Sequence, residues 1–179
     1  MIKQDKKESK NSGNNKIKSL YKIAIFAGGC FWGVEYYMQA QEGVISVESG
    51  YTGGCVENPS YEQVKSQKTG HVEAVKITYD STITDYETLL RFFFEIHDPT
   101  QNDRQGIDIG SQYRSEIFYQ TEEEKIIILR VIAILKNKGY QVVTRVTEAG
   151  PFYLAEAYHQ DYFERHEGEP DCHFYTPRF

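Results

Sequence analysis

Residues 21–37 read YKIAIFAGGCFWGVEYY, in which an apolar run meets a pair of glycines, a cysteine and two aromatic residues. Residues 23–27 have the length and apolar character of a buried strand, which the glycines at positions 28 and 29 end. From Trp32 onward the apolar residues recur at helical spacing, and this pattern ends near residue 41. Cys30 is therefore predicted to lie where a buried strand turns into a helix.

The position of Cys30 predicts a reactive thiol. A helix N-terminus offers unpaired backbone N–H groups and the positive end of the helix dipole, and both stabilise a negative charge. We therefore predict that the pKa of the Cys30 thiol is lowered by about one to several units. The alternative is a small buried residue at the end of a strand, because free cysteine is among the most buried residue types. Phe31 and Trp32 leave a similar choice open, between core packing and an apolar wall beside the thiol.

Periodicity elsewhere in the chain predicts the fold class. Further strands are expected at residues 44–51, 72–79, 116–119 and 141–146. Helices are expected from a Thr84–Glu87 capping box to Ile96, from a Thr121–Glu124 capping box to Lys138, and over residues 154–165, with a short turn or one-turn helix at residues 58–61. Because strands and helices alternate irregularly, we predict an α+β fold: a two-layer sandwich with a mixed β-sheet, a ferredoxin-like core and helices packed on it.

Composition predicts one folded domain with two tails. The chain has 179 residues, 40% of them hydrophobic and 26% charged, which is enough to bury a core. Residues 1–20 are rich in Lys, Asn, Ser and Gly and are expected to form a disordered N-terminal tail. The folded domain is expected at residues 21–166, followed by a C-terminal tail at residues 167–179.

Charge and hydropathy argue against two classes of partner. The net charge of −6 argues against nucleic acid, because phosphate binding needs a basic face. No stretch is long and apolar enough to span a membrane. The polar, Lys-rich N-terminal stretch lacks the apolar run of a signal peptide, so we expect a cytoplasmic protein.

The cysteines and histidines do not form a metal-binding pattern. The three cysteines are widely spaced, with no CxxC pair and no HExxH motif, which argues against a disulfide framework and a zinc site. His159, His166 and His173 recur every seven residues, but Gly168 and Pro170 interrupt that stretch. We therefore expect no metal and no cofactor.

Glu73 is a candidate proton donor. Strand alternation places Glu73 on the same face as Val75, Ile77 and Tyr79, which is the more apolar face of its strand. A carboxyl group on that face is desolvated, so its pKa should rise and it should be able to deliver a proton at neutral pH. The alternative is that Glu73 lies near the strand end and reaches solvent.

The loop at residues 98–112 supplies further polar candidates. It is long and rich in Gly, Asp and Asn, and such loops are more often functional than idle. It contains Asp108 and leads to Tyr113. A plain structural loop explains its glycines and its Asp-Pro turn equally well.

Several segments together resemble the A-type peptide methionine sulfoxide reductases. In that family's order they read GGCFWGVE, GYTGG, ENPSYEQV, TGHVEAVKITYD, FFEIHDPTQNDRQGIDIGSQYRS and AEAYHQDYF, and they span about residues 22–165. The GCFWG element and the run from IHDPT to QYRS are the most specific of them. The resemblance implies that residues 21–166 form a catalytic domain that reduces methionine S-sulfoxide.

The resemblance also implies a role for each candidate that contacts the substrate sulfoxide. Cys30 matches the cysteine that attacks the sulfur, and Glu73 matches the acid that protonates the oxygen. Tyr61 and Tyr113 match hydroxyl groups that hydrogen-bond the same oxygen. Asp108 matches an acidic loop residue that orders the polar side of the pocket.

Phe31 and Trp32 match the aromatic wall that takes the substrate methyl group in that family.

The first product that the resemblance implies is methionine, with a sulfenic acid left on Cys30, and a sulfenic acid condenses readily with a second thiol. Cys172 in the C-terminal tail is the expected resolving cysteine, and Cys55 remains an alternative.

The family resemblance implies thioredoxin as the reductant of the resulting disulfide. The implied substrates are oxidised proteins, peptides and free methionine sulfoxide, so the enzyme would repair proteins after oxidative damage. We expect the chain to act as a monomer.

Two other functional classes remain open from the residues alone. A thiol hydrolase that forms an acyl intermediate needs a base such as His71, His97 or His159 beside Cys30, and nothing in the sequence ties one to it. A non-catalytic module that only binds oxidised methionine would need no redox thiols, which argues against it.

Overall fold

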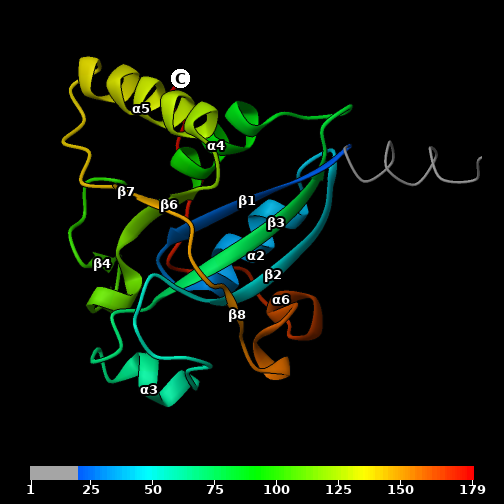
Figure 1. Ribbon diagram of the computed structural model, residues 1–179, viewed down its shortest axis with the longest axis vertical. Helices are drawn as coiled ribbons and strands as arrows, with labels where there is room; N and C mark the ends of the chain where they lie inside the picture. Colours follow the sequence, from blue (N-terminus) through cyan, green and yellow to red (C-terminus); the bar gives the residue numbers. More distant parts are fainter. Residues whose placement is uncertain (1–19) are drawn as a thin grey trace, which may run out of the picture.

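A six-stranded mixed sheet organises the molecule (Figure 1). The computed structural model describes residues 20–179, so the predicted disorder of residues 1–20 lies almost wholly outside the described residues. The strands of the sheet are β1 (Tyr21–Gly28), β2 (Val44–Thr52), β3 (Val72–Asp80), β6 (Ser115–Tyr119), β7 (Arg145–Glu148) and β8 (Tyr153–Leu154), and they lie in the order β7-β6-β1-β3-β2-β8. Only the β6–β7 pair is parallel.

The four central strands have the connectivity of a ferredoxin-like fold. With helices α2 (Phe31–Gln39) and α4 (Tyr86–Ile96), the chain runs β1-α2-β2-β3-α4-β6, and the four strands lie in the order β6-β1-β3-β2. The predicted α+β class, mixed sheet and ferredoxin-like core are therefore confirmed.

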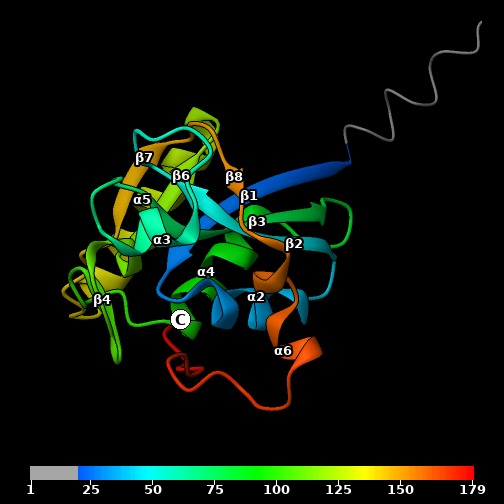
Figure 2. The ribbon, with the colours of Figure 1, turned by 90° about the horizontal axis from the view of Figure 1, so that it is seen from below.

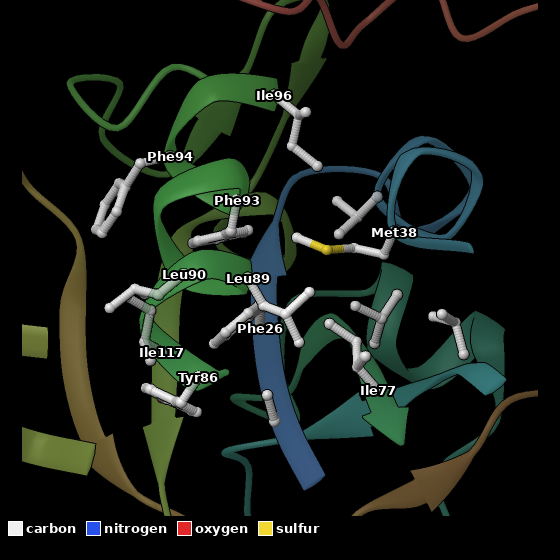
Figure 3. Packing of buried hydrophobic residues seen from close by; sticks show 14 of the residues in the cluster. Phe26, Met38, Ile77, Tyr86, Leu89, Leu90, Phe93, Phe94, Ile96 and Ile117 are labelled. Atoms are coloured by element: carbon white, nitrogen blue, oxygen red, sulfur yellow. The ribbon is translucent and has the colours of Figure 1, made fainter. Parts of the chain in front are cut away.

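Helices α2 and α4 cover one face of this sheet and bury the main core (Figure 3). Phe93 of α4 stacks on Phe26 of β1 with ring centroids 4.9 Å apart, and Met38 of α2 packs into the same layer. Helix α5 (Glu122–Asn137) packs outside α4. The opposite face buries a smaller cluster beneath residues 149–152, so the fold has two layers.

Two helix starts differ in detail from the predicted capping boxes. Helix α4 begins one residue later than predicted, because the Asp85 carboxylate accepts from the Thr88 N–H at 2.8 Å and Thr84 takes no part. The Thr121 side chain does cap α5 through the Glu124 N–H, whereas the Glu124 carboxylate binds the N–H of Gln120.

The predicted fifth strand is shifted toward the C-terminus. Strand β7 covers residues 145–148, and residues 141–144 form no regular structure. Only residues 145–148 lie alongside β6, where they pair with residues 116–119. The residues with strand propensity begin before residue 145, at Val142 and Val143. Only the part that can hydrogen-bond to β6 becomes a strand.

The predicted last helix, at residues 154–165, is wrong. Its place is taken by β8, a 3₁₀ turn at residues 157–159 and the short helix α6 (Tyr162–Arg165). Gln160 binds both the N–H and the carbonyl of Ser49 at 2.9 Å, which holds the segment against the edge of β2. Asp161 then adopts a left-handed conformation with φ of 51°, which interrupts any helix.

Two irregular segments complete the domain around the start of α2. The predicted loop at residues 98–112 forms a small hairpin, β4 (Arg104–Gln105) and β5 (Asp108–Ile109), followed by a 3₁₀ turn at residues 111–113. Figure 2 shows the C-terminal segment running from α6 past α2 to α4. There the Thr176 N–H donates to the carbonyl of Glu95 at 2.7 Å. Among residues 20–179, no helix is both long and apolar enough to cross a membrane.

Candidate active site

Cys30 is the N-cap of α2, directly after β1, as predicted from the sequence. The N–H of Trp32 hydrogen-bonds its sulfur and lowers the thiol pKa. Gly29 makes the tight turn with φ of +99°, and a Cβ at this position would lie 2.6 Å from the side chain of Gln105. Glycine is therefore required for the close approach of the 98–112 loop to the start of the helix.

The predicted lowering of the Cys30 pKa is wrong for this state of the protein. A hydrogen bond with Cys172, burial and the charge of Glu73 together raise the pKa of the Cys30 thiol well above its usual value. One of the helix-start N–H groups is also committed elsewhere, because the Phe31 N–H donates to Glu73. Burial and the neighbouring groups outweigh the helix terminus here.

Glu73 is a buried carboxylic acid beside Cys30. It lies on β3 opposite Tyr51, is 3% exposed, and its Oε2 accepts the Phe31 N–H at 3.1 Å. Burial raises its pKa to about 8, with further contributions from Asp108 and Cys172, against the lowering effect of the Phe31 N–H. The predicted burial and raised pKa of Glu73 are confirmed, and at pH 7 the group carries a proton.

Tyr61 and Tyr113 bring two hydroxyl groups to the same place. Tyr61 opens the short helix α3 (Tyr61–Lys65), which Ser60 starts with a capping box, and its N–H donates to Glu156 at 2.8 Å. Burial and then the charge of Glu73 raise the pKa of Tyr61 to about 12. Tyr113 is half-buried, and the same two causes raise its pKa. Both hydroxyls therefore remain protonated donors.

Asp108 lies on β5 next to the C-terminal tail. Burial, then the charge of Cys172 and a hydrogen bond with that thiol, together raise the pKa of Asp108 to about 6, against the lowering effect of His173. The structure therefore brings Asp108 to Cys172, and its charge also raises the pKa of Glu73.

The aromatic pair beside Cys30 divides into two environments. Phe31 is 1% exposed and packs against Tyr51 and His159 as part of the main core. Trp32 is partly exposed and stacks on Tyr162, and its Nε1–H donates to His159 Nδ1 at 3.0 Å. Only Trp32 presents accessible surface in this state.

Of the two candidate resolving cysteines, Cys172 lies next to Cys30 and Cys55 does not. The thiols of Cys30 and Cys172 each shift the pKa of the other, which places them next to each other, and neither is in a disulfide. The ring of His173 anchors this segment, since its Nε2 bonds the Gly28 carbonyl at 2.7 Å. Cys55 is exposed, and its sulfur faces the carbonyl of Thr69 at 3.6 Å.

None of the histidines that a thiol hydrolase would need is paired with Cys30. His71 bonds the N–H of Gly54 at 3.0 Å and the carbonyl of Val56 at 2.7 Å. His97 bonds Ser115 and the carbonyl of Phe93, and His159 bonds Trp32. Each ring is committed to a structural partner, which disfavours acyl-transfer chemistry.

Two features of the site were not identified from the sequence. Glu156 links two site elements, because it accepts from the Tyr51 hydroxyl at 2.7 Å and from the backbone of Tyr61. His173 stood out only by its seven-residue spacing from His166 and His159, and the structure places it and His159 in separate contacts. Within residues 20–179, no three His, Cys, Asp or Glu side chains gather as a metal site would require.

The chain is similar to one family of known proteins. A family model described as peptide methionine sulfoxide reductase matches residues 22–178. Peptide methionine sulfoxide reductase MsrA of Sulfolobus acidocaldarius is 48% identical over 151 residues, covering 84% of this chain and 86% of that protein. MsrA of Mycobacterium tuberculosis strain H37Rv is 49% identical over 157 residues, covering 86% and 84%.

Solved structures agree with the sequence comparison. The reduced form of Mxr1 from Saccharomyces cerevisiae superimposes with a TM-score of 0.84 at 29% identity, covering 89% of this chain and 94% of that one. Methionine sulfoxide reductase A of Corynebacterium diphtheriae has a TM-score of 0.73 at 31% identity, covering 82% and 75%. With the family match spanning nearly the whole described domain, the chain belongs to the A-type peptide methionine sulfoxide reductases.

Proposed function

We propose that this oxidoreductase reduces the S epimer of methionine sulfoxide, free or in proteins, by way of a sulfenic acid on Cys30 and a Cys30–Cys172 disulfide. The observation that carries the proposal is that the buried, protonated Glu73 lies beside Cys30, and that the thiol of Cys172 lies beside Cys30 as well. Proton donor, nucleophile and resolving group are the three parts that this chemistry needs.

The first step requires the C-terminal tail to make way for substrate. In the present state Cys172 lies next to Cys30, and its interaction with that thiol is the largest cause of the raised Cys30 pKa. When substrate displaces Cys172, that cause disappears and the N–H of Trp32 remains, so the Cys30 thiol ionises more easily. Substrate entry and activation of the nucleophile are then one event.

Glu73 delivers the proton that makes the sulfoxide reactive. As Glu73 protonates the oxygen, the substrate sulfur becomes electrophilic and the Cys30 sulfur attacks it. The substrate S–O bond breaks, the oxygen passes to Cys30 as a sulfenic acid, and methionine leaves. The proton of the Cys30 thiol replaces the one that Glu73 gave, so the substrate is reduced by two electrons and Cys30 is oxidised by two.

Tyr61 and Tyr113 support the polar side of this reaction. Their raised pKa values keep both hydroxyls protonated as charge develops on the sulfoxide oxygen. We assign Asp108 to the ordering of this polar side. The accessible face of Trp32, above the buried Phe31, is the apolar surface for the substrate methyl group.

Cys172 closes the catalytic cycle. Its sulfur attacks Cys30, a disulfide forms, and the sulfenic oxygen leaves as water. Thioredoxin then reduces the disulfide, and the fold relative Mxr1 has been solved in complex with Trx2. Cys172 also lines a cavity of about 360 Å³ whose edge includes Ile107 and Phe174, which are 75% and 67% exposed. This cavity is a route by which an external dithiol reaches the sulfur.

A single-turnover experiment tests the proposal. Reduced protein is mixed with each epimer of methionine sulfoxide in turn, without reductant, and methionine and the disulfide map are measured. We expect about one equivalent of methionine from the S epimer, very little from the R epimer, and a Cys30–Cys172 bond. Turnover of the R epimer, or a disulfide between Cys30 and Cys55, would refute the corresponding part.

A further inference from the structure

His173 has one ring nitrogen available to the thiol of Cys172. Its Nε2 lies 2.7 Å from the carbonyl oxygen of Gly28, and a carbonyl only accepts, so Nε2 carries a hydrogen. In the neutral ring Nδ1 therefore has a free lone pair, and it lies 3.1 Å from the Cys172 sulfur. This tautomer allows Nδ1 to accept the thiol proton.

The ring of His173 is held in this position from several sides. The residue is 1% exposed, and its carbonyl accepts from the Tyr37 hydroxyl at 3.3 Å. It fills space that a side chain at position 33 would take, since a Cβ on Gly33 would lie 2.3 Å from Nδ1. The glycine of the GCFWG segment thus makes room for the imidazole, and the ring cannot turn freely away from the sulfur.

We propose that His173 is the catalytic base of the resolving step, taking the proton of Cys172 as that thiol attacks the oxidised Cys30. The proposal rests on the proposed function, because it needs a sulfenic acid on Cys30. A new S–S bond forms while the S–O bond of the sulfenic acid breaks. The thiol proton moves to Nδ1 and then balances the hydroxide that departs as water, so no additional oxidant or reductant is consumed.

Several titratable groups surround Cys172 and His173. The titratable groups that influence Cys172 or His173 lie on the helices, the strands, the loop and the tail around them: Cys30, Tyr37, Glu73, His97, Asp108 and Asp171.

The thiol of Cys172 has a pKa well below its usual value, because Cys30 and then His173 hydrogen-bond it, against burial and the charge of Asp171. In the resolving state Cys30 carries oxygen and its thiol donor is gone. The lowering contributions that remain in this environment come from His173, so the base matters most at the moment when Cys172 must attack.

The test is the pH dependence of disulfide formation in His173→Gln. Glutamine keeps an amide N–H that reaches toward the Gly28 carbonyl, but it has no basic nitrogen for Cys172. An ordinary thiol is only about 0.3% ionised at pH 6, and the greater nucleophilicity of a more basic thiolate recovers part of that deficit. We expect disulfide formation about tenfold slower than wild type at pH 6, with the difference vanishing by about pH 7.

The measurement follows one turnover with methionine S-sulfoxide from pH 5.5 to 8.5. Methionine is quantified, the sulfenic acid on Cys30 is trapped with a dimedone-type probe, and disulfide is counted after acid quench and alkylation. The resolving rate of wild type should depend less on pH than that of His173→Gln, which should rise about tenfold per pH unit and leave a long-lived sulfenic acid. His166→Ala is the matched control, because that ring is exposed and bonds only the carbonyl of Tyr162.

Each outcome decides the matter. A flat profile in His173→Gln, whether at the wild-type rate or uniformly slower, overturns the base role, since a merely structural histidine would not change the slope. His173→Asn should show the same slope as His173→Gln, so the proposal remains testable if one variant fails to fold. If wild type forms no methionine, the proposed function itself fails, whereas methionine without any pH difference defeats only the role of His173.

Discussion

Glu73→Gln should make the protein almost inactive and more stable at the same time. Glutamine has the size of glutamic acid, and its carbonyl can still accept the Phe31 N–H that Glu73 Oε2 accepts at 3.1 Å. It has no proton to give to a sulfoxide oxygen and no charge to bury. The substitution therefore separates the catalytic role of the carboxyl group from its structural cost.

The size of both effects follows from the environment of Glu73. Burial raises its pKa from 4.5 to about 8, so ionisation is disfavoured in the folded state. The protonated carboxyl group contributes fully to the free energy of unfolding below about pH 4.5, and this contribution is lost as the pH rises through 8. At about 1.4 kcal/mol per pH unit, the loss at pH 7 is about 3 kcal/mol, which corresponds to about 6–12 °C in Tm for a domain of this size.

Removing a positioned proton donor slows the first turnover by a factor of about 10² or more. In wild type the single-turnover rate should fall by about tenfold per pH unit above pH 8, where Glu73 deprotonates. In Glu73→Gln the residual rate should lack this fall. The assay combines methionine release in one turnover with thermal unfolding of the reduced protein at pH 5, 7 and 8.

Glu35→Gln is the matched control. Glu35 lies on α2, is 1% exposed, and burial raises its pKa to about 7. Its replacement should stabilise the protein at pH 8 without slowing methionine release. A Glu73→Gln variant with the wild-type rate, or one that is less stable than wild type at pH 8, would refute the reasoning.

Four further substitutions test other parts of the site. Cys172→Ser should release one equivalent of methionine and then stop in the presence of thioredoxin, whereas Cys55→Ser should continue to turn over; equal behaviour of the two would contradict the resolving role of Cys172. Gly33→Ala should keep its helix, where alanine is favoured by about 1 kcal/mol. At pH 6 it should form the disulfide about tenfold more slowly, because the new Cβ displaces His173; circular dichroism and the disulfide rate check this. Tyr61→Phe should slow methionine release by about tenfold, the effect of one hydrogen bond to developing charge, and an unchanged single-turnover rate would remove Tyr61 from the mechanism.

The central part of the fold could be predicted because its signals are local. The buried strand before Cys30 and the apolar alternation around Glu73 each depend on a few consecutive residues, and both patterns persist in the structure. The edges of the sheet could not be predicted in the same way. The pattern predicts a strand at residues 141–146, but the strand forms at residues 145–148, where the chain meets β6. At residues 154–165 the predicted helix is absent, and the side chain of Gln160 instead bonds the backbone of Ser49.

The site residues also differ in whether a local sequence pattern predicts their pKa. The raised pKa of Glu73 followed from the pattern of its own strand, because burial is its largest cause. The pKa of Cys30 could not be predicted from its local sequence. The helix start predicts a lowered pKa, whereas the largest cause of the raised pKa is the thiol of Cys172, at the far end of the chain.

The sequence by itself therefore determined the fold class, the family resemblance and the candidates for the nucleophile and the acid, because these depend on local periodicity and on motifs. Only the tertiary structure decided that Cys172 lies next to Cys30 and raises the pKa of its thiol, and that the ring of His173 is anchored on the carbonyl of Gly28. Such contacts join segments more than a hundred residues apart, and no local pattern encodes the packing that brings them together.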